Sequence, residues 1–185
     1  MKYLLLRWLG ALACLGFFSL SQISAAPKAA GPDKPNFSGA WTLDLSASNS
    51  MGPLMTRIGA SFIDRQYAGL VKLTAALHQT DDVLKIAARG PGFALDETLY
   101  LDGRNDTGNL QLLGATSLNC RTAWSKDNQQ LVETHQIRTK QGKEGQLVIR
   151  RYLTNEGKTL VAVYSRQLKT EPNKISAQQV WRKQA

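Results

Sequence analysis

The sequence predicts an all-β domain: a closed antiparallel meander β-barrel of about ten strands, with a short helix–turn–helix lid between the first two strands. Short segments of alternating apolar and polar residues recur along most of the chain. Turn sequences rich in Gly, Asn, Asp and Pro separate these segments, so neighbouring strands can pair as hairpins. A long meander would expose two sheet edges, and closure into a barrel removes them. Eight and ten strands both remain open from the pattern alone.

The first 25 residues are typical of a secretory signal peptide. Lys2 and Arg7 give a positive start, Trp8–Leu20 is a short apolar run, and small residues follow. The apolar run is shorter than the ~20 residues that a membrane-spanning helix needs. We therefore expect cleavage after Ala25 and export to the periplasm or the exterior.

The two cysteines bear on where the mature protein would reside. Ala11–Cys14 weakly resembles a lipoprotein processing site, and this alternative would anchor the chain through an acylated Cys14. Cleavage after Ala25 instead leaves Cys120 as the only cysteine, which cannot form an internal disulfide. The remaining chain of about 160 residues is long enough to bury a core without one.

The net charge indicates the class of partner. The whole chain carries +9, and the first 25 residues contribute two of these charges and no acid, which leaves +7. The excess is spread out without a block of like charges or interleaved aromatic residues. We therefore expect no nucleic-acid binding, and transient contact with an anionic membrane surface is the partner that this charge favours.

The elements are expected in a fixed order along the chain. Residues 26–35 are a flexible lead-in to one domain over 36–185, which opens with a strand over 37–45. Apolar residues at helical spacing predict two short helices over Leu54–Leu70, joined near Gly59. Asp102-Gly103 predicts a hairpin turn. The other strands are expected over 71–79, 83–88, 93–101, 110–113, 118–124, 131–138, 146–153, 160–168 and 175–181.

Several of these segments resemble the intracellular fatty-acid-binding and retinoid-binding protein family. Phe37–Leu43 is similar to the family's opening F-x-G-x-W-x-L strand, and Met55–Phe62 to its helix–turn–helix. Arg151–Gly157 resembles the R-E-L-T-N-D-G run of the retinoid-binding branch, and Val180–Arg182 the final V-Y-x-R. The resemblance covers most of residues 36–182 and implies a calycin-type, lipocalin-like barrel that binds a lipid. The family is cytosolic, whereas this chain begins with a signal-peptide pattern, so an exported bacterial-type relative is expected.

The resemblance also implies where a ligand would bind. The family's carboxylate clamp combines an arginine two strands before the end with an Arg-x-Tyr on the last strand. Arg151 matches the first position, whereas Gln179 and Trp181 replace the later arginine and tyrosine. One buried arginine can still hold a carboxylate bidentately. The candidate ligand-binding residues, with the portal phenylalanine and the helical lid, are Arg151, Gln179, Trp181, Phe93, Met55, Ile58 and Phe62.

A purely structural role for these residues stays open beside ligand binding. Ile149 and Arg151 share one face of a strand, and an interior guanidinium would need an anion because an unpaired buried charge is costly. If Arg150 and its neighbours face inward instead, Arg151 is solvated. Gln179 and Trp181 could pack across strands without touching a ligand, and the helical residues could only seal the core.

No catalytic motif is visible. The sequence lacks Gly-x-Ser-x-Gly, a phosphate loop, a zinc-protease helix and Cys-x-x-Cys. His78 and His135 lie far apart, with no cysteine or carboxylate at ligand spacing, so we expect no metal site and no cofactor. Glu133 and Glu144 read as isolated carboxylates, and Cys120 reads as a small apolar residue.

These observations predict an exported, monomeric binding protein that sequesters a small hydrophobic or amphipathic ligand, a fatty acid or another lipid, inside a barrel. Two alternatives belong to other classes. One is a filled-core barrel that acts as an interaction module of the envelope without a small ligand. The other is an enzyme on a lipocalin-like scaffold.

Overall fold

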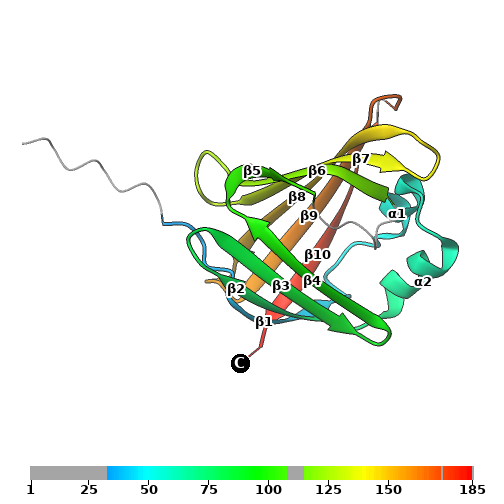
Figure 1. The fold of residues 1–185 in the computed structure, drawn as a ribbon. Helices are drawn as coiled ribbons and strands as arrows, with labels where there is room; N and C mark the ends of the chain where they lie inside the picture. Colours follow the sequence, from blue (N-terminus) through cyan, green and yellow to red (C-terminus); the bar gives the residue numbers. More distant parts are fainter. Residues whose placement is uncertain (1–32, 108–114, 172, 185) are drawn as a thin grey trace, which may run out of the picture.

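The computed structural model describes residues 33–107, 115–171 and 173–184, which contain ten strands and two helices (Figure 1). The signal-peptide pattern, most of the lead-in and the strand expected over 110–113 lie outside the described residues. The elements are β1 (Gly39–Asp44), α1 (Gly52–Ile58), α2 (Phe62–Leu70), β2 (Thr74–Gln79), β3 (Val83–Gly90), β4 (Phe93–Tyr100), β5 (Asp102–Asp106), β6 (Ala115–Trp124), β7 (Leu131–Thr139), β8 (Glu144–Thr154), β9 (Thr159–Leu168) and β10 (Ile175–Lys183).

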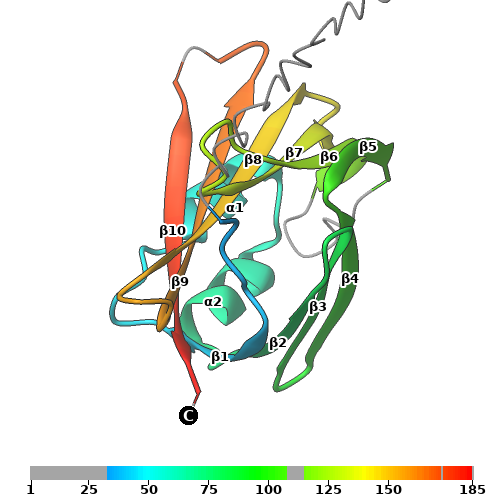
Figure 2. The ribbon, with the colours of Figure 1, turned by 90° about the vertical axis from the view of Figure 1, so that its left-hand side faces the viewer.

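The ten strands form one antiparallel sheet that curls into a barrel (Figures 1 and 2). Their hydrogen-bonded order is β4-β3-β2-β1-β10-β9-β8-β7-β6-β5. Apart from β4 and β5, strands that follow one another in the chain pair as a meander, and β1 also pairs with β10, which brings the two ends of the domain together. The all-β meander is confirmed, with ten strands in the described residues.

The predicted barrel is confirmed, and it is nearly closed. In the part of the chain that the structure describes, no ladder joins β4 to β5. Asp102-Gly103 does not turn a hairpin between them: it lies inside β5, which pairs with β6 and is irregular between Asp102 and Asn105. Gly103 has φ +77°, a left-handed conformation that favours glycine. The chain therefore bends between β4 and β5 (Figure 2).

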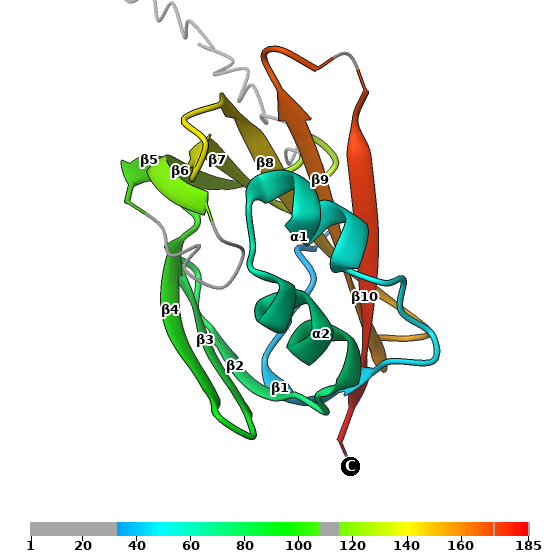
Figure 3. The ribbon, with the colours of Figure 1, turned by 90° about the vertical axis from the view of Figure 1, so that its right-hand side faces the viewer.

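The helix pair lies across one end of the barrel (Figure 3). Pro53 occupies the first turn of α1, where its missing N–H leaves no intrahelical bond unmade. Gly59 ends the helix with φ +93°, and its N–H donates to the carbonyls of Met55 and Thr56. A capping box starts α2, since Ser61 and Asp64 exchange side-chain to backbone hydrogen bonds of 3.1 and 3.2 Å. The predicted break near Gly59 is confirmed.

Two apolar clusters fill the two halves of the barrel. One surrounds the fully buried Trp41, whose indole N–H donates to the Phe37 carbonyl at 3.0 Å. The other lies under α1, which buries Leu54, Met55 and Ile58 against β7, β8 and β9. Within the described residues, no helix is both long and apolar enough to cross a bilayer.

Candidate functional site

A cavity of about 190 Å³ lies in the barrel interior where the two apolar clusters meet. Its wall is mostly apolar and carries a small set of polar groups. Both helices contribute to the wall, so the lid forms part of the enclosure. The lining residues are Met51, Met55, Asp64, Ala68, Val71, Leu73, Ala88, Phe93, Leu95, Glu97, Glu133, Ile149, Arg151, Tyr164, Gln179 and Trp181.

Arg151 lies on the interior face of β8 and is only 7% exposed, which decides the question that the sequence left open. Its guanidinium Nη1 donates to Oε2 of Glu133, which is 1% exposed on β7. Arg151 pairs in register with Leu131, and Glu133 pairs with Ile149. The two charges are therefore diagonal neighbours on adjacent strands, a spacing that long side chains can bridge.

The pair holds both groups in their charged forms. Burial opposes ionisation of Glu133, but the positive charge of Arg151 and the hydrogen bond from His135 outweigh it and hold the pKa of this carboxyl well below its usual range. Burial likewise opposes the charge of Arg151, and Glu133 more than offsets this effect, so the pKa of Arg151 is raised. The prediction that an interior arginine must find an anion is confirmed, and the anion belongs to the protein.

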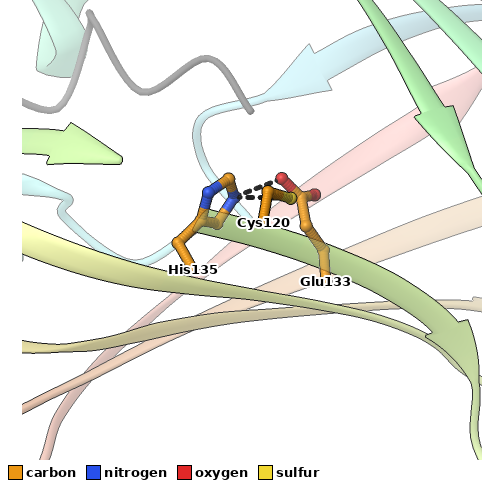
Figure 4. Close-up of side chains that lie close together, drawn as sticks. All are labelled: Cys120, Glu133 and His135. Atoms are coloured by element: carbon orange, nitrogen blue, oxygen red, sulfur yellow. Dashed lines mark hydrogen bonds and ion pairs between the residues drawn. The ribbon is translucent and has the colours of Figure 1, made fainter. Parts of the chain in front are cut away.

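Glu133 and Cys120 both lie beside the ring of His135 (Figure 4). The fully buried His135 uses Nε2 to bond Oε1 of Glu133, while its Nδ1 lies 3.0 Å from the Ser117 hydroxyl. The Cys120 sulfur lies 3.8 Å from the same Nε2. Both ring nitrogens are thus engaged, and the ring orients the carboxylate toward Arg151.

This cluster does not have the geometry of a nucleophilic triad. In a triad one ring nitrogen faces the nucleophile and the other faces the acid, whereas Cys120 and Glu133 share Nε2 of His135. Burial raises the pKa of the Cys120 thiol to about 12, so the thiolate is scarce.

The same three side chains correct the statement that His135 has no possible co-ligand. Glu133, His135 and Cys120 offer one oxygen, one nitrogen and one sulfur atom within 4.8 Å of one another. Such a donor set suits zinc, but Glu133 and His135 already bond each other and Glu133 also bonds Arg151. The alternation along β7 was the signal for the contact between Glu133 and His135, because these residues lie two positions apart and share one face of the strand.

A second polar contact lies on the cavity wall formed by β9 and β10. The Tyr164 hydroxyl donates to Oε1 of Gln179 at 3.0 Å. Burial raises the pKa of Tyr164, with Arg151 opposing that rise and Glu133 adding to it. Tyr164 therefore stays a neutral donor, and the Gln179 amide presents its NH₂ group as the remaining donor.

The structure separates the predicted ligand-binding residues into two groups. Arg151, Gln179, Trp181, Phe93 and Met55 all line the cavity. Ile58 and Phe62 do not: Ile58 is fully buried in the cluster under α1, and Phe62 is 65% exposed on the outer surface of α2. Ile58, the last residue of α1, thus seals the core, which is the alternative that the sequence left open, and Phe62 is exposed because α2 presents a different face to the barrel.

Sequence reasoning missed other polar residues of the interior. Glu97 lines the cavity from β4, and Tyr164 lines it from β9.

Two further charged residues have partners that the sequence did not reveal. Glu144 is not isolated, since it bonds Arg138 and Lys169 at 2.9 Å each. Arg166 is also fully buried: its Nη2 donates to Glu171 at 2.8 Å, and its other guanidinium nitrogens have no partner among the described residues.

Comparison with known proteins identifies the fold through solved structures. No protein-family model and no curated sequence matches the chain. Three solved structures match over 80% of it: a fatty acid transporter, REP1-NXSQ (TM-score 0.60, 12% identity, 96% of that chain); lipid binding protein 8 of Caenorhabditis elegans in its apo form (0.60, 14%, 95%); and a Schistosoma mansoni fatty acid binding protein in complex with arachidonic acid (0.59, 16%, 96%). The chain thus shares the barrel fold of these proteins, as its motifs predicted.

Proposed function

We propose that this protein binds a small hydrophobic or amphipathic ligand in its interior cavity and shields it from water. The observation that carries this proposal is the cavity itself, lined mostly by apolar side chains with a few polar groups among them. The similar structures are described as fatty acid or lipid binding proteins, which supports the same class of ligand. A filled-core module has less support, because its interior would leave no such space.

The cavity volume constrains the ligand. About 190 Å³ is less than the ~300–1,000 Å³ of typical small-molecule sites. A short-chain ligand therefore fits the cavity as it stands, and a longer one requires α2, which contributes Asp64 and Ala68 to the wall, to move outward. Each Å² of apolar surface removed from water contributes about 25 cal/mol to binding.

Displacement of an apolar fluorescent probe, together with native mass spectrometry of the purified protein, tests the proposal. Ala88→Leu fills part of the cavity, since Ala88 lines it from β3. Ala87→Leu is the matched control, because its neighbour Ala87 lies outside the lining on the same strand. We expect the first variant to lose probe binding and the second to keep it. Equal probe binding by the two variants would place the ligand elsewhere.

We further propose that α2 contacts anionic membranes, where the ligand would be loaded or released. Phe62, Ile63 and Leu70 of α2 are 65%, 77% and 77% exposed, an uncommon concentration of apolar surface on one short helix. Cosedimentation with phosphatidylglycerol vesicles should drop for Phe62→Ser/Ile63→Ser. Leu118→Ser, at an exposed apolar site on β6, is the control. Undiminished cosedimentation of the α2 variant would contradict the contact.

The last part of the proposal is that the protein is exported from the cytoplasm. The motif over residues 1–25 supports cleavage after Ala25 and a soluble protein outside the cytoplasm. The intact mass of the protein recovered from a secreting host identifies the first residue. A chain that starts at Ala26 supports the proposal, whereas an acylated chain that starts at Cys14 favours the lipoprotein alternative.

A further inference from the structure

We propose that Glu133 is an internal counter-ion that makes the cavity select ligands with an uncharged polar end and reject free carboxylates. This inference rests on the proposed function, and it names the class of ligand that the same cavity takes: an alcohol, ester, ketone or amide attached to an apolar body. The residue that matches a carboxylate-binding arginine, Arg151, is present but already occupied.

The first argument is that the charge of Arg151 is already neutralised. Its Nη1 donates to Glu133, which is 1% exposed and is held in place by the buried His135. An entering carboxylate would have to share Arg151 with Glu133 or displace it. Either outcome leaves Glu133 a buried anion that is less well neutralised by its cation, which is unfavourable.

The second argument is the sign of the charges around the cavity. The lining contains three carboxylates, from Asp64, Glu97 and Glu133, and one cation, Arg151. The other buried arginine, Arg166, bonds Glu171 and does not line the cavity. A ligand carboxylate would therefore enter a cavity whose one described lining cation already faces Glu133, and it would meet the negative charge of Glu133 in a low-dielectric interior.

The third argument is the donor that remains for a neutral group. The Tyr164 hydroxyl bonds Oε1 of Gln179, which fixes the orientation of the amide and directs its NH₂ group as a donor at the cavity wall. An uncharged oxygen acceptor can take this hydrogen bond without disturbing the pair of Glu133 and Arg151. Trp181 and Ile149 supply apolar surface in the same wall.

Ligands that share one chain and differ only in the polar end test the inference with the unmodified protein. Displacement of a fluorescent probe is measured for dodecanol, methyl laurate and laurate at pH 8, where laurate is ionised, below the concentration at which each aggregates. We expect dodecanol and methyl laurate to bind at least about tenfold more tightly than laurate, the effect of one lost or repelled hydrogen bond to a charged group. Equal or tighter binding of laurate would overturn the inference. Binding of none of the three would overturn the proposed function itself.

A variant assigns the selectivity to Glu133. Glu133→Gln keeps the shape of the side chain and removes the competing charge, so laurate should bind about 10- to 100-fold more tightly while dodecanol changes little. Glu144→Gln, which removes a carboxylate at the other end of the hairpin between β7 and β8, should change neither affinity. A folded Glu133→Gln with unchanged affinity for laurate would refute the role of Glu133. If this variant does not fold, the comparison of laurate with dodecanol on the unmodified protein still decides the selectivity.

Discussion

Replacing Glu133 by leucine should destabilise the barrel far more than replacing Glu133 and Arg151 together by leucine. The two residues are 1% and 7% exposed, so the single change leaves a guanidinium buried without its anion. Such a change costs about 3–5 kcal/mol of unfolding free energy, whereas replacing a whole buried pair by apolar residues is often neutral or stabilising. His135 loses its carboxylate partner in both variants, which adds about 1–3 kcal/mol to each.

Urea unfolding followed by tryptophan fluorescence at pH 7 measures the three variants of the cycle: the two single changes and the double change. A thermal melt gives a second measurement. For a domain of this size, each kcal/mol of lost unfolding free energy lowers Tm by roughly 2–4 °C, so Glu133→Leu should lower Tm by at least about 8 °C. Glu144→Leu, at a surface site, should stay within about 0.5 kcal/mol of the parent protein. If the cost of the double change equals the sum of the two single costs, Glu133 and Arg151 do not interact and the reasoning is refuted.

The same pair predicts a pH dependence whose sign follows from the lowered pKa of Glu133. The pKa of this carboxyl is about 2 in the folded protein, below the ordinary glutamate value of 4.5. Because the folded value is the lower one, its stabilisation is complete above the unfolded pKa and is lost as the pH falls through the folded pKa. Unfolding free energy should therefore decline from about pH 5 towards pH 2, and this decline should be smaller in the double variant.

The remaining predictions concern backbone packing and the buried thiol. Gly145→Ala should cost at least about 1–3 kcal/mol in urea unfolding, because its added Cβ would lie 2.3 Å from the Gln167 carbonyl oxygen; a cost near zero would contradict the packing. Gly69→Ala, in α2 with no atom within 4 Å of the added Cβ, should instead be neutral or stabilise by up to about 1 kcal/mol. Cys120 should resist iodoacetamide at pH 8 until the protein unfolds, since its pKa is about 12. Cobalt(II) should give no sulfur-to-cobalt charge-transfer absorption with the native protein, and a stoichiometric band would show that Cys120 and His135 bind a metal.

The local elements followed from the sequence because their causes are local. Alternation over a few residues indicated the strands, and helical spacing with Gly59 and Pro53 indicated two short helices, as observed. The hairpin predicted at Asp102-Gly103 was wrong because the left-handed glycine turns the chain without pairing β4 to β5. The placement of Phe62 at the cavity failed because residue spacing shows that a helix has an apolar side but not which side meets the barrel.

The candidate site depended on pairings between strands. The sequence placed Arg151 on an apolar face of a strand and left Glu133 without a visible partner. Which face was interior, and which residue lay diagonal to Arg151, depended on the register of β7 against β8.

By itself, then, the sequence determined most strands and the helix pair of a meander barrel and placed Arg151 on an apolar face of a strand. Only the tertiary structure decided that the barrel stays unpaired between β4 and β5, that its interior keeps a cavity, and that Arg151 meets Glu133 there. The physical reason is that backbone preferences act over a few residues, whereas a buried charge is neutralised by whatever the register of neighbouring strands brings within reach.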